Sequence, residues 1–430
     1  MKIVTYDSEQ HGVRLPRKIF GVFMITVMLS FAACVTIAEP LEPAKAKADP
    51  DGNGAKISPG SPEARPPQTV LPSNMEGEAV LSRQQNGAKT LNLAPFDPDG
   101  KTLWYDCRDL PVEGKGWTNT ESFYDRFPAK ARGMVEKKTW DLSRDSAGIC
   151  VRFVTDADSI QVRWTLLYSQ LALPHMPATG VSGMDLYARD KTEQWQFLSI
   201  GNPYPTSMVN TVKMTSRPGV EHLLYLPLYN GVTSVEIGIP KERMIKPVAV
   251  SGKSIVFYGT SITQGGCASR PGMAYTAIVG RKLDVPVINL GFSGSGDMEP
   301  AIGDLLAELD PAIFVLDCMA NMKADLIPQR VEPFVKKLRN AHPATPIVLV
   351  EDSHVRNTTP TTKGRILRDV YKKLTDGGMT NLYFISNEGM LGDDSEGTVD
   401  GCHPNDLGMM RLAQVFIKKL APLLHSSPQN

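Results

Sequence analysis

The feature that most constrains the fold is an alternation of strand-like and helix-like segments in the second half of the chain. Continuous apolar runs are typical of strands buried on both faces, and helical stretches separate them. A parallel sheet covered by helices on both faces produces this alternation, so the sequence predicts a three-layer α/β/α domain with a parallel sheet. The expected strands lie at 254–258, 285–290, 312–316, 347–350 and 382–385, and the expected helices near 274–283, 302–309, 331–341, 365–374 and 408–424.

An earlier part of the chain, residues 91–250, has a different pattern. Short runs with β-branched and aromatic residues are separated by Gly, Pro, Asn and Asp, and several of them alternate apolar with polar residues. Such runs are typical of strands with one face in a core. The sequence therefore predicts a jelly-roll-like β-sandwich over 91–250, followed by the α/β domain over 251–425.

The N-terminus carries an export pattern. Arg14, Arg17 and Lys18 precede an apolar stretch over 19–35 and then small residues, which predicts an export signal over residues 1–38. The apolar stretch is shorter than the ~20 residues of a typical membrane-spanning helix, and an uncleaved anchor is the alternative. We expect a protein exported to the periplasm or the extracellular space.

Residues 39–90 are rich in Pro, Ala, Gly, Lys and Glu and have hardly any aromatic side chain. Such a segment cannot bury enough apolar surface to order itself, so a disordered linker is expected. Cys34 stands in Phe31-Ala-Ala-Cys34, which leaves a bacterial lipid anchor as a second alternative to plain secretion.

Charge and cysteine content exclude several classes. The 46 basic and 46 acidic residues balance, so no broad positive field exists to attract nucleic acid or an anionic membrane. The six cysteines lack regular spacing, which predicts neither a disulfide scaffold nor a zinc ribbon. For Cys267 and Cys402, which flank two of the segments discussed next, a bridge and two buried thiols both remain open.

Several predicted strands are followed by polar residues or glycines that together could catalyse one reaction. Ser261 comes directly after the first strand, and Asp400 precedes His403 by three residues, a spacing that lets the carboxylate orient the imidazole. Gly294 and Asn321 follow two further strands and can offer N–H donors to a developing oxyanion. In parallel sheets, sites lie beyond the carboxyl ends of the strands. The pattern predicts acyl transfer.

These segments, at 259–262, 289–294, 316–321 and 400–403, resemble the four blocks of the SGNH, or GDSL-like, hydrolase family. The resemblance covers about residues 252–424. It implies that Ser261 is the nucleophile and first oxyanion donor, that Gly294 and Asn321 are the second and third donors, and that Asp400 and His403 complete the triad. It also implies a flavodoxin-like form of the three-layer α/β/α fold and that no cofactor is needed.

Two departures from the family pattern stand out. Thr260 occupies the place of the common aspartate before the serine, and Met319 and Met322 replace the glycine and aspartate around Asn321. The run 181–187 contains Gly-Met-Asp-Leu-Tyr, which resembles the Gly-x-Asp-Leu-Tyr signature of an N-terminal domain found in one branch of these esterases.

Other polar residues receive weaker interpretations. Arg270 either reaches a substrate hydroxyl or carboxylate or pairs with Asp297, and His354 is expected at the rim, with substrate contact as the lesser alternative. Asp400 and His403 lack a third ligand at usable spacing, so no metal is expected. The remaining histidines that have no partner pattern are expected at the surface or in turns: His175, His222, His342 and His425.

The sequence thus predicts an exported serine esterase that removes short acyl groups, acetyl above all, from a small-molecule or polysaccharide ester. The carbohydrate part of this hypothesis depends on the family resemblance. The alternatives are a lipase or thioesterase for longer chains, and an inactive domain that binds carbohydrate. Neither nucleic acid nor a stable membrane partner is expected, and the sequence leaves the oligomeric state open.

Overall fold

The computed structural model describes residues 93–94, 100–353 and 360–425. All of them belong to one compact unit, Gly60–Asn430. The expected export signal, the linker, Cys34, His354 and the side chain of His425 lie outside the described residues. Within the described part, no helix is long and apolar enough to cross a membrane.

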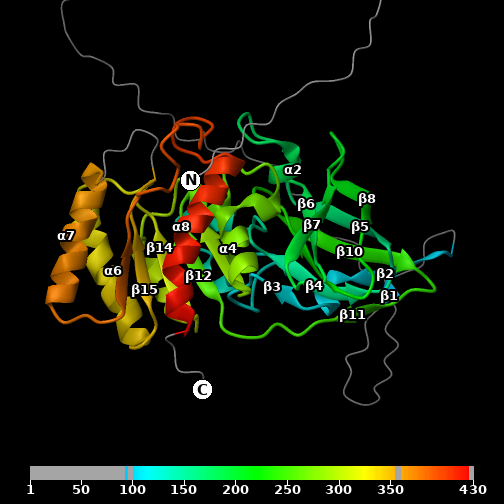
Figure 1. The fold of residues 1–430 in the computed structure, drawn as a ribbon, viewed down its shortest axis with the longest axis horizontal. Helices are drawn as coiled ribbons and strands as arrows, with labels where there is room; N and C mark the ends of the chain where they lie inside the picture. The colour runs from blue at the N-terminus through cyan, green and yellow to red at the C-terminus, as the bar shows by residue number, and fades with distance from the viewer. Residues whose placement is uncertain (1–92, 95–99, 354–359, 426–430) are drawn as a thin grey trace, which may run out of the picture. The chain divides into compact units, whose positions relative to one another are not determined.

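The first half of the described chain forms two antiparallel sheets, as Figure 1 shows on its right-hand side. The elements of this half are β1 (Leu93–Ala94), β2 (Thr102–Asp106), η1 (Cys107–Asp109), β3 (Val112–Glu113), η2 (Ala129–Ala131), α1 (Lys137–Ser143), β4 (Cys150–Thr155), β5 (Ser159–Leu166), α2 (Ala178–Val181), β6 (Met184–Arg189), β7 (Trp195–Gly201), β8 (Val209–Thr215), β9 (Glu221–Tyr225), β10 (Val232–Pro240) and β11 (Ile245–Pro247). One sheet has the order β1-β2-β10-β5-β8 and the other the order β11-β4-β9-β6-β7, with β3 added beside β4.

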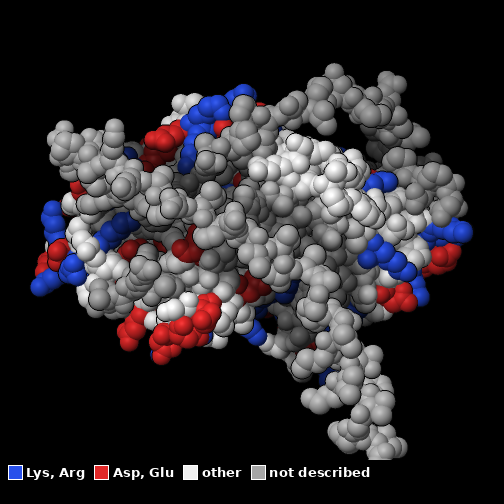
Figure 2. Space-filling view, turned by 90° about the horizontal axis from the view of Figure 1, so that it is seen from above, with Lys and Arg blue, Asp and Glu red and all other residues white. Residues whose placement is uncertain are grey.

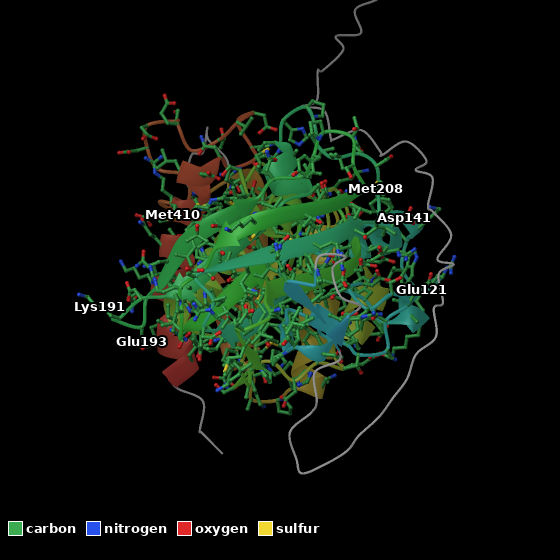
Figure 3. All side chains as sticks on the ribbon, turned by 90° about the vertical axis from the view of Figure 1, so that its right-hand side faces the viewer. Glu121, Asp141, Lys191, Glu193, Met208 and Met410 are labelled. Carbon is green, nitrogen blue, oxygen red and sulfur yellow. The ribbon has the colours of Figure 1, made fainter. Side chains whose placement is uncertain are left out.

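The two sheets enclose one core. Along β5, buried residues alternate with partly exposed ones, because successive side chains of a strand point to opposite faces. Phe153, Trp164, Leu186 and Leu224 from both sheets are buried in this core. The predicted β-sandwich is therefore confirmed. Figure 3 views it from the side, with Lys191 and Glu193 of the β6–β7 turn at one end and Met208, just before β8, at the other.

The second half forms a parallel sheet of the order β13-β12-β14-β15-β16. Its elements are β12 (Ile255–Gly259), α3 (Ser261–Gln264), η3 (Pro271–Met273), α4 (Tyr275–Leu283), β13 (Val287–Gly291), α5 (Pro300–Leu306), β14 (Ile313–Asp317), α6 (Ile327–Ala341), β15 (Ile347–Val350), α7 (Thr362–Asp376), β16 (Leu382–Ile385) and α8 (Asp406–His425). Figure 1 shows α6 and α7 side by side, on the side of the sheet away from the sandwich. The predicted α/β/α fold and its five strands are confirmed.

Each face of the parallel sheet has its own core. Ile255 and Phe257 of β12 pack with residues of α4 and α8, whereas Val256 and Tyr258 pack with residues of α5, α6 and α7. Because the chain moves from β12 to β13 on one side and then crosses to β14 on the other, β12 lies at the switch point of the strand order. Ligands of open parallel sheets bind beside the carboxyl end of such a strand, which here is where Ser261 lies.

A buried arginine joins the two halves. Arg126 is 1% exposed and donates from its guanidinium to the carbonyl oxygens of Asn289 (3.1 Å) and Gly291 (2.7 Å) at the end of β13. It also donates to the carbonyl oxygens of Leu142 and Asp145 in the first half. Burial lowers the pKa of Arg126 to about 10, so it stays charged at neutral pH. Arg126 therefore links the main chains of the two halves by hydrogen bonds at the carboxyl edge of the sheet.

Candidate active site

A tight strand-to-helix turn presents Ser261. β12 ends at Gly259, where a Cβ would lie 2.1 Å from Thr263 Oγ1 and 2.5 Å from the Asp317 carbonyl oxygen, so a glycine is required. Thr260 caps α3 by accepting a hydrogen bond from the N–H of Ile262 at 3.2 Å. Threonine therefore serves as the helix cap at the position where the family commonly has aspartate. The N–H of Ser261, at the first position of α3, has no partner within the helix and is available as a donor.

Ser261, His403 and Asp400 lie in one hydrogen-bonded chain. Ser261 Oγ is 2.8 Å from His403 Nε2, although the two residues are 142 positions apart, and His403 Nδ1 is 2.7 Å from Asp400 Oδ2. Ser261 is 6% exposed and His403 9%. The base, its orienting carboxylate and the hydroxyl have the order that nucleophilic catalysis by serine requires. Three residues chosen from the sequence are thus brought together.

The carboxylate of Asp400 is held in its charged form. Partial burial raises its pKa, but hydrogen bonds from the His403 side chain and from the N–H groups of His403 and Cys402 outweigh that effect. The pKa of Asp400 is therefore below its usual value. Asp400 Oδ1 accepts from the N–H of His403 at 2.7 Å and from the N–H of Cys402 at 2.9 Å, which fixes the loop as well as the side chain.

The Asn321 amide joins two of the predicted oxyanion segments. Its hydrogen bonding is satisfied when the oxygen faces the N–H groups of Gly294, Ser295 and Gly296, at 3.2, 3.0 and 3.1 Å. This orientation leaves the amide NH₂ of Asn321 to donate elsewhere. Gly294 has φ +68°, a conformation that favours glycine, and its N–H is the most distant of the three from Asn321. The role of both residues as oxyanion donors stays a prediction.

A lysine fixes the loop before Asn321. Lys363 Nζ, in the first turn of α7, donates to the carbonyl oxygens of Met319 (2.9 Å) and Ala320 (3.2 Å). Met319, which stands where the family commonly has glycine, is fully buried. On the other side of the site, Lys138 Nζ lies 3.3 Å from the Gly294 carbonyl oxygen and is exposed. Ammonium groups therefore border both loops that carry the predicted donors.

Residues of the sandwich half make hydrogen bonds to the segment that carries Ser261. Tyr229, in the β9–β10 segment, donates from its phenol to the Ser261 carbonyl oxygen at 3.1 Å. Gln264 of α3 donates to Asp145 Oδ2 at 2.9 Å and accepts from the N–H of Ser293 at 3.0 Å. Sequence reasoning missed Tyr229, Gln264 and Asp145, since these contacts join distant segments and no motif marks them.

His175 lies beside the triad. Its ring centroid is 6.0 Å from that of His403, with an angle of 38° between the ring planes. Burial lowers the pKa of His175, repulsion from His403 lowers it further, and Asp400 raises it. The expectation that His175 lies at the surface or in a turn is right, whereas its position beside His403 has no signal in the sequence. For His222 the same expectation is wrong: it is fully buried and stacks on Phe153.

Other sequence candidates have different positions. Arg270 donates to Asp185 Oδ2 at 2.7 Å and to the Tyr187 hydroxyl at 2.6 Å, so it docks the hydrolase half onto the Gly-x-Asp-Leu-Tyr strand. The alternative pairing with Asp297 is wrong, because Asp297 pairs with Arg330 at 2.6 Å. Since its guanidinium is committed to these two partners, Arg270 is not favoured as a substrate contact.

Cys267 and Cys402 are both free thiols, so the alternative of a bridge between them is wrong. Burial raises the pKa of Cys267 to about 12, and the neighbouring Asp400 and Cys402 add to the shift, so this thiol is neutral at physiological pH. Among the described residues, no group of three or more His, Cys, Asp or Glu side chains is arranged to hold a metal ion.

Two family models match the chain. Residues 252–421 match the GDSL-like lipase/acylhydrolase family, and residues 102–245 match the GxDLY family, described as the N-terminus of SGNH-hydrolase-type esterases. No curated protein sequence matches.

Solved structures are also similar. A protein from Bacteroides ovatus described as a GDSL-like lipase is 32% identical, with a TM-score of 0.70, and the match covers 75% of this chain and 98% of that one. The salicylyl-acyltransferase SsfX3 of a tetracycline biosynthetic pathway is 17% identical, with a TM-score of 0.58 over 80% and 95% of the two chains. A family two carbohydrate esterase from Clostridium thermocellum, solved with cellohexaose, is 15% identical, with a TM-score of 0.49 over 65% and 93%. The chain belongs to the GDSL-like lipase/acylhydrolase family and is an SGNH-type esterase with an N-terminal GxDLY domain.

Proposed function

We propose that this esterase hydrolyses short acyl esters, acetyl esters above all, on the hydroxyl groups of carbohydrates, through an acyl-enzyme on Ser261. The observation that carries the proposal is the chain of contacts from Ser261 Oγ to His403 (2.8 Å) and from His403 to Asp400 (2.7 Å). It supplies a nucleophile, a base and a group that holds the base in the correct tautomer.

The reaction has two halves. His403 Nε2 takes the proton of Ser261 Oγ as that oxygen attacks the ester carbonyl, and the same nitrogen then gives the proton to the departing alkoxide. A water molecule, deprotonated by His403, attacks the acyl-enzyme and releases the carboxylic acid and free Ser261. The negative charge on the carbonyl oxygen is stabilised by the N–H of Ser261, the NH₂ of Asn321 and the N–H of Gly294, which turns toward it from its 3.2 Å contact with the Asn321 oxygen.

The polar groups around the triad support the proposal that the alcohol part of the ester carries further hydroxyl groups, as a sugar does. Lys138 and Lys363 border the oxyanion loops, and His175 lies beside His403. On the face in Figure 2, basic and acidic side chains of the described residues are interspersed, without a broad field of one sign. A neutral, hydrogen-bonding partner such as a sugar fits these surroundings better than a polyanion.

The low exposure of Ser261 and His403, 6% and 9%, supports a small acyl group. A series of 4-nitrophenyl esters with chains of two to twelve carbons tests this part of the proposal. We expect kcat/KM to be highest for acetate and to fall steadily with chain length. A maximum at eight carbons or more would instead favour a lipase or thioesterase.

The export pattern of residues 1–38 supports a place of action outside the cytoplasm. Mass spectrometry of mature protein from the producing cell tests it, because removal of the signal shortens the chain and a lipid on Cys34 adds mass. Mature protein that still begins at Met1 would contradict both cleaved secretion and a lipid anchor on Cys34.

Acetate release from acetylated polysaccharides tests the substrate class. We expect the native enzyme to release acetate and Ser261→Ala to release it at least 10³-fold more slowly. If the Ser261→Ala variant binds the polysaccharide and the native protein releases no acetate from any ester, the chain is a carbohydrate-binding protein instead.

A further inference from the structure

A two-residue turn aims His175 at the active site. Leu173 and Met176 exchange both of their main-chain hydrogen bonds, each at 3.0 Å, which leaves Pro174 and His175 at the tip of the turn. Met176 is 2% exposed and anchors the turn in the apolar core that the sandwich shares with α4 and α8. Proline at the tip restricts the backbone further, so His175 is held in place rather than free to turn away.

The same turn is attached to the nucleophile loop. The turn leads into α2, where Thr179 Oγ1 donates to the Ser269 carbonyl oxygen at 2.6 Å. The carbonyl oxygen of Val181, at the end of α2, accepts from the N–H of Tyr229, the residue whose phenol holds Ser261. Figure 1 shows α2 at the same edge of the molecule as the loop that leads into α8, which carries His403. The position of His175 relative to His403 is therefore built into the fold.

His175 is not part of the proton relay. Both ring nitrogens of His403 are engaged, Nε2 by Ser261 and Nδ1 by Asp400. No described residue hydrogen-bonds to the ring of His175, which is partly exposed and has a centroid 6.0 Å from that of His403. The ring is thus free to make hydrogen bonds to a bound molecule.

The reaction determines which part of the substrate lies near His175. Since His403 Nε2 protonates the leaving oxygen, that oxygen has to lie within hydrogen-bond distance of Nε2. A hydroxyl on the neighbouring carbon of the alcohol lies close to the leaving oxygen, and the His175 ring, whose centroid is 6.0 Å from that of His403, is near enough to meet it. A neutral imidazole donates from one nitrogen and accepts at the other, which matches a hydroxyl, itself both donor and acceptor.

Resting on the function proposed above, we propose that His175 binds the hydroxyl adjacent to the scissile ester and so selects esters of vicinal diols, as in partly acetylated sugars. The sandwich domain then contributes directly to specificity. The preferred substrate would be a monoacetylated diol unit, and esters of simple alcohols would be poorer.

Two esters of equal size test the proposal. 2-Hydroxyethyl acetate and propyl acetate share the acyl group and differ at one position, a hydroxyl in place of a methyl group. The readout is the ratio of their kcat/KM values, so that propyl acetate is the internal reference for each variant. We expect the native enzyme to prefer 2-hydroxyethyl acetate, and His175→Ala and His175→Phe to lower the ratio about fivefold, the effect of one hydrogen bond.

His175→Gln retains a donor and an acceptor, and we expect it to keep the ratio within about twofold of the native value. His342→Ala is the matched control, since His342 bonds the Ala307 carbonyl oxygen and is not part of the site, and its ratio is expected to equal that of the native enzyme. His175→Phe keeps the ring packing, so it tests the proposal even if His175→Ala does not fold.

A native enzyme without preference for 2-hydroxyethyl acetate would overturn the proposal. So would His175 variants in which both esters slow equally, because a purely structural role acts on both. These outcomes are distinct from failure of the esterase mechanism, in which Ser261→Ala would hydrolyse both esters as fast as the native enzyme.

Discussion

The phenol of Tyr229 donates a hydrogen bond to the carbonyl oxygen of Ser261 over 3.1 Å. Tyr229 belongs to the sandwich and Ser261 to the parallel sheet, so the bond joins the accessory domain to the backbone of the nucleophile. The carbonyl oxygen of Ser261 also accepts from the N–H of Gly266 at 2.7 Å. The sandwich therefore helps to define where the reacting hydroxyl lies.

Replacing Tyr229 by Phe keeps the ring but removes this bond. One neutral hydrogen bond contributes about 1 kcal/mol, and we expect kcat to fall about three- to tenfold because Ser261 is held less firmly. Steady-state kinetics with an acetyl ester measures the change. The exposed Tyr204, 57% accessible on the sandwich, gives the control variant Tyr204→Phe, which is expected to behave as native. Equal kcat values for Tyr229→Phe and native enzyme would show that the bond has no catalytic role.

Asp400→Asn tests the orienting carboxylate. The amide cannot accept from His403 Nδ1–H as a charged group does, and it permits the wrong imidazole tautomer, so kcat is expected to fall by about 10³- to 10⁴-fold. The control variant is Asp393→Asn. Asp393 is an exposed aspartate in the same loop, so this variant should have the native kcat. A decrease of less than tenfold in Asp400→Asn would assign Asp400 a different role.

Asn321→Ala removes both the amide oxygen, which accepts from the N–H groups of residues 294–296, and the amide NH₂. We expect kcat to fall by about 10²- to 10³-fold, the usual effect of losing one oxyanion donor, with a smaller change in KM. Asn321→Asp keeps an oxygen for the N–H groups of residues 294–296 but has no NH₂ to donate, so it should be at least as slow as Asn321→Ala. Full activity in Asn321→Asp would mean that Asn321 only holds the loop.

The sequence was sufficient for the parts of the site that follow strand ends. The alternation of apolar runs and helices predicts parallel strands, and parallel strands bring Ser261, Gly294 and Asn321 to one edge of the sheet. Tyr229 and His175 have no such signal, because their positions depend on how the sandwich packs on the sheet.

The histidine in the sandwich core predicts a pH-dependent stability. The pKa of His222 is lowered to about 4, mainly by burial, and its Nε2 accepts from the N–H of Arg217 at 3.0 Å, which protonation would disrupt. The unfolded chain, with the usual His pKa near 6.5, therefore binds more protons between about pH 4 and pH 6.5. Stability is expected to decrease as pH falls through this window, by roughly 3 kcal/mol at pH 4.

Chemical unfolding of the native protein and of His222→Gln at several pH values checks this effect. The variant lacks the titrating group but retains an acceptor for Arg217, so its free energy of unfolding should decrease less between pH 7 and pH 4.5. Parallel curves for the two proteins over this window would contradict the assignment of the pH effect to His222.

The central claim is that Ser261 Oγ is the attacking atom, activated by His403 at 2.8 Å. The most direct measurement is peptide mass spectrometry after reaction with an organophosphate, which traps a serine activated by a histidine. The account predicts one covalent adduct on Ser261, formed in proportion to the loss of ester hydrolysis and absent from Ser261→Ala. An adduct on another residue that abolishes activity, or full inhibition with Ser261 unmodified, would contradict it.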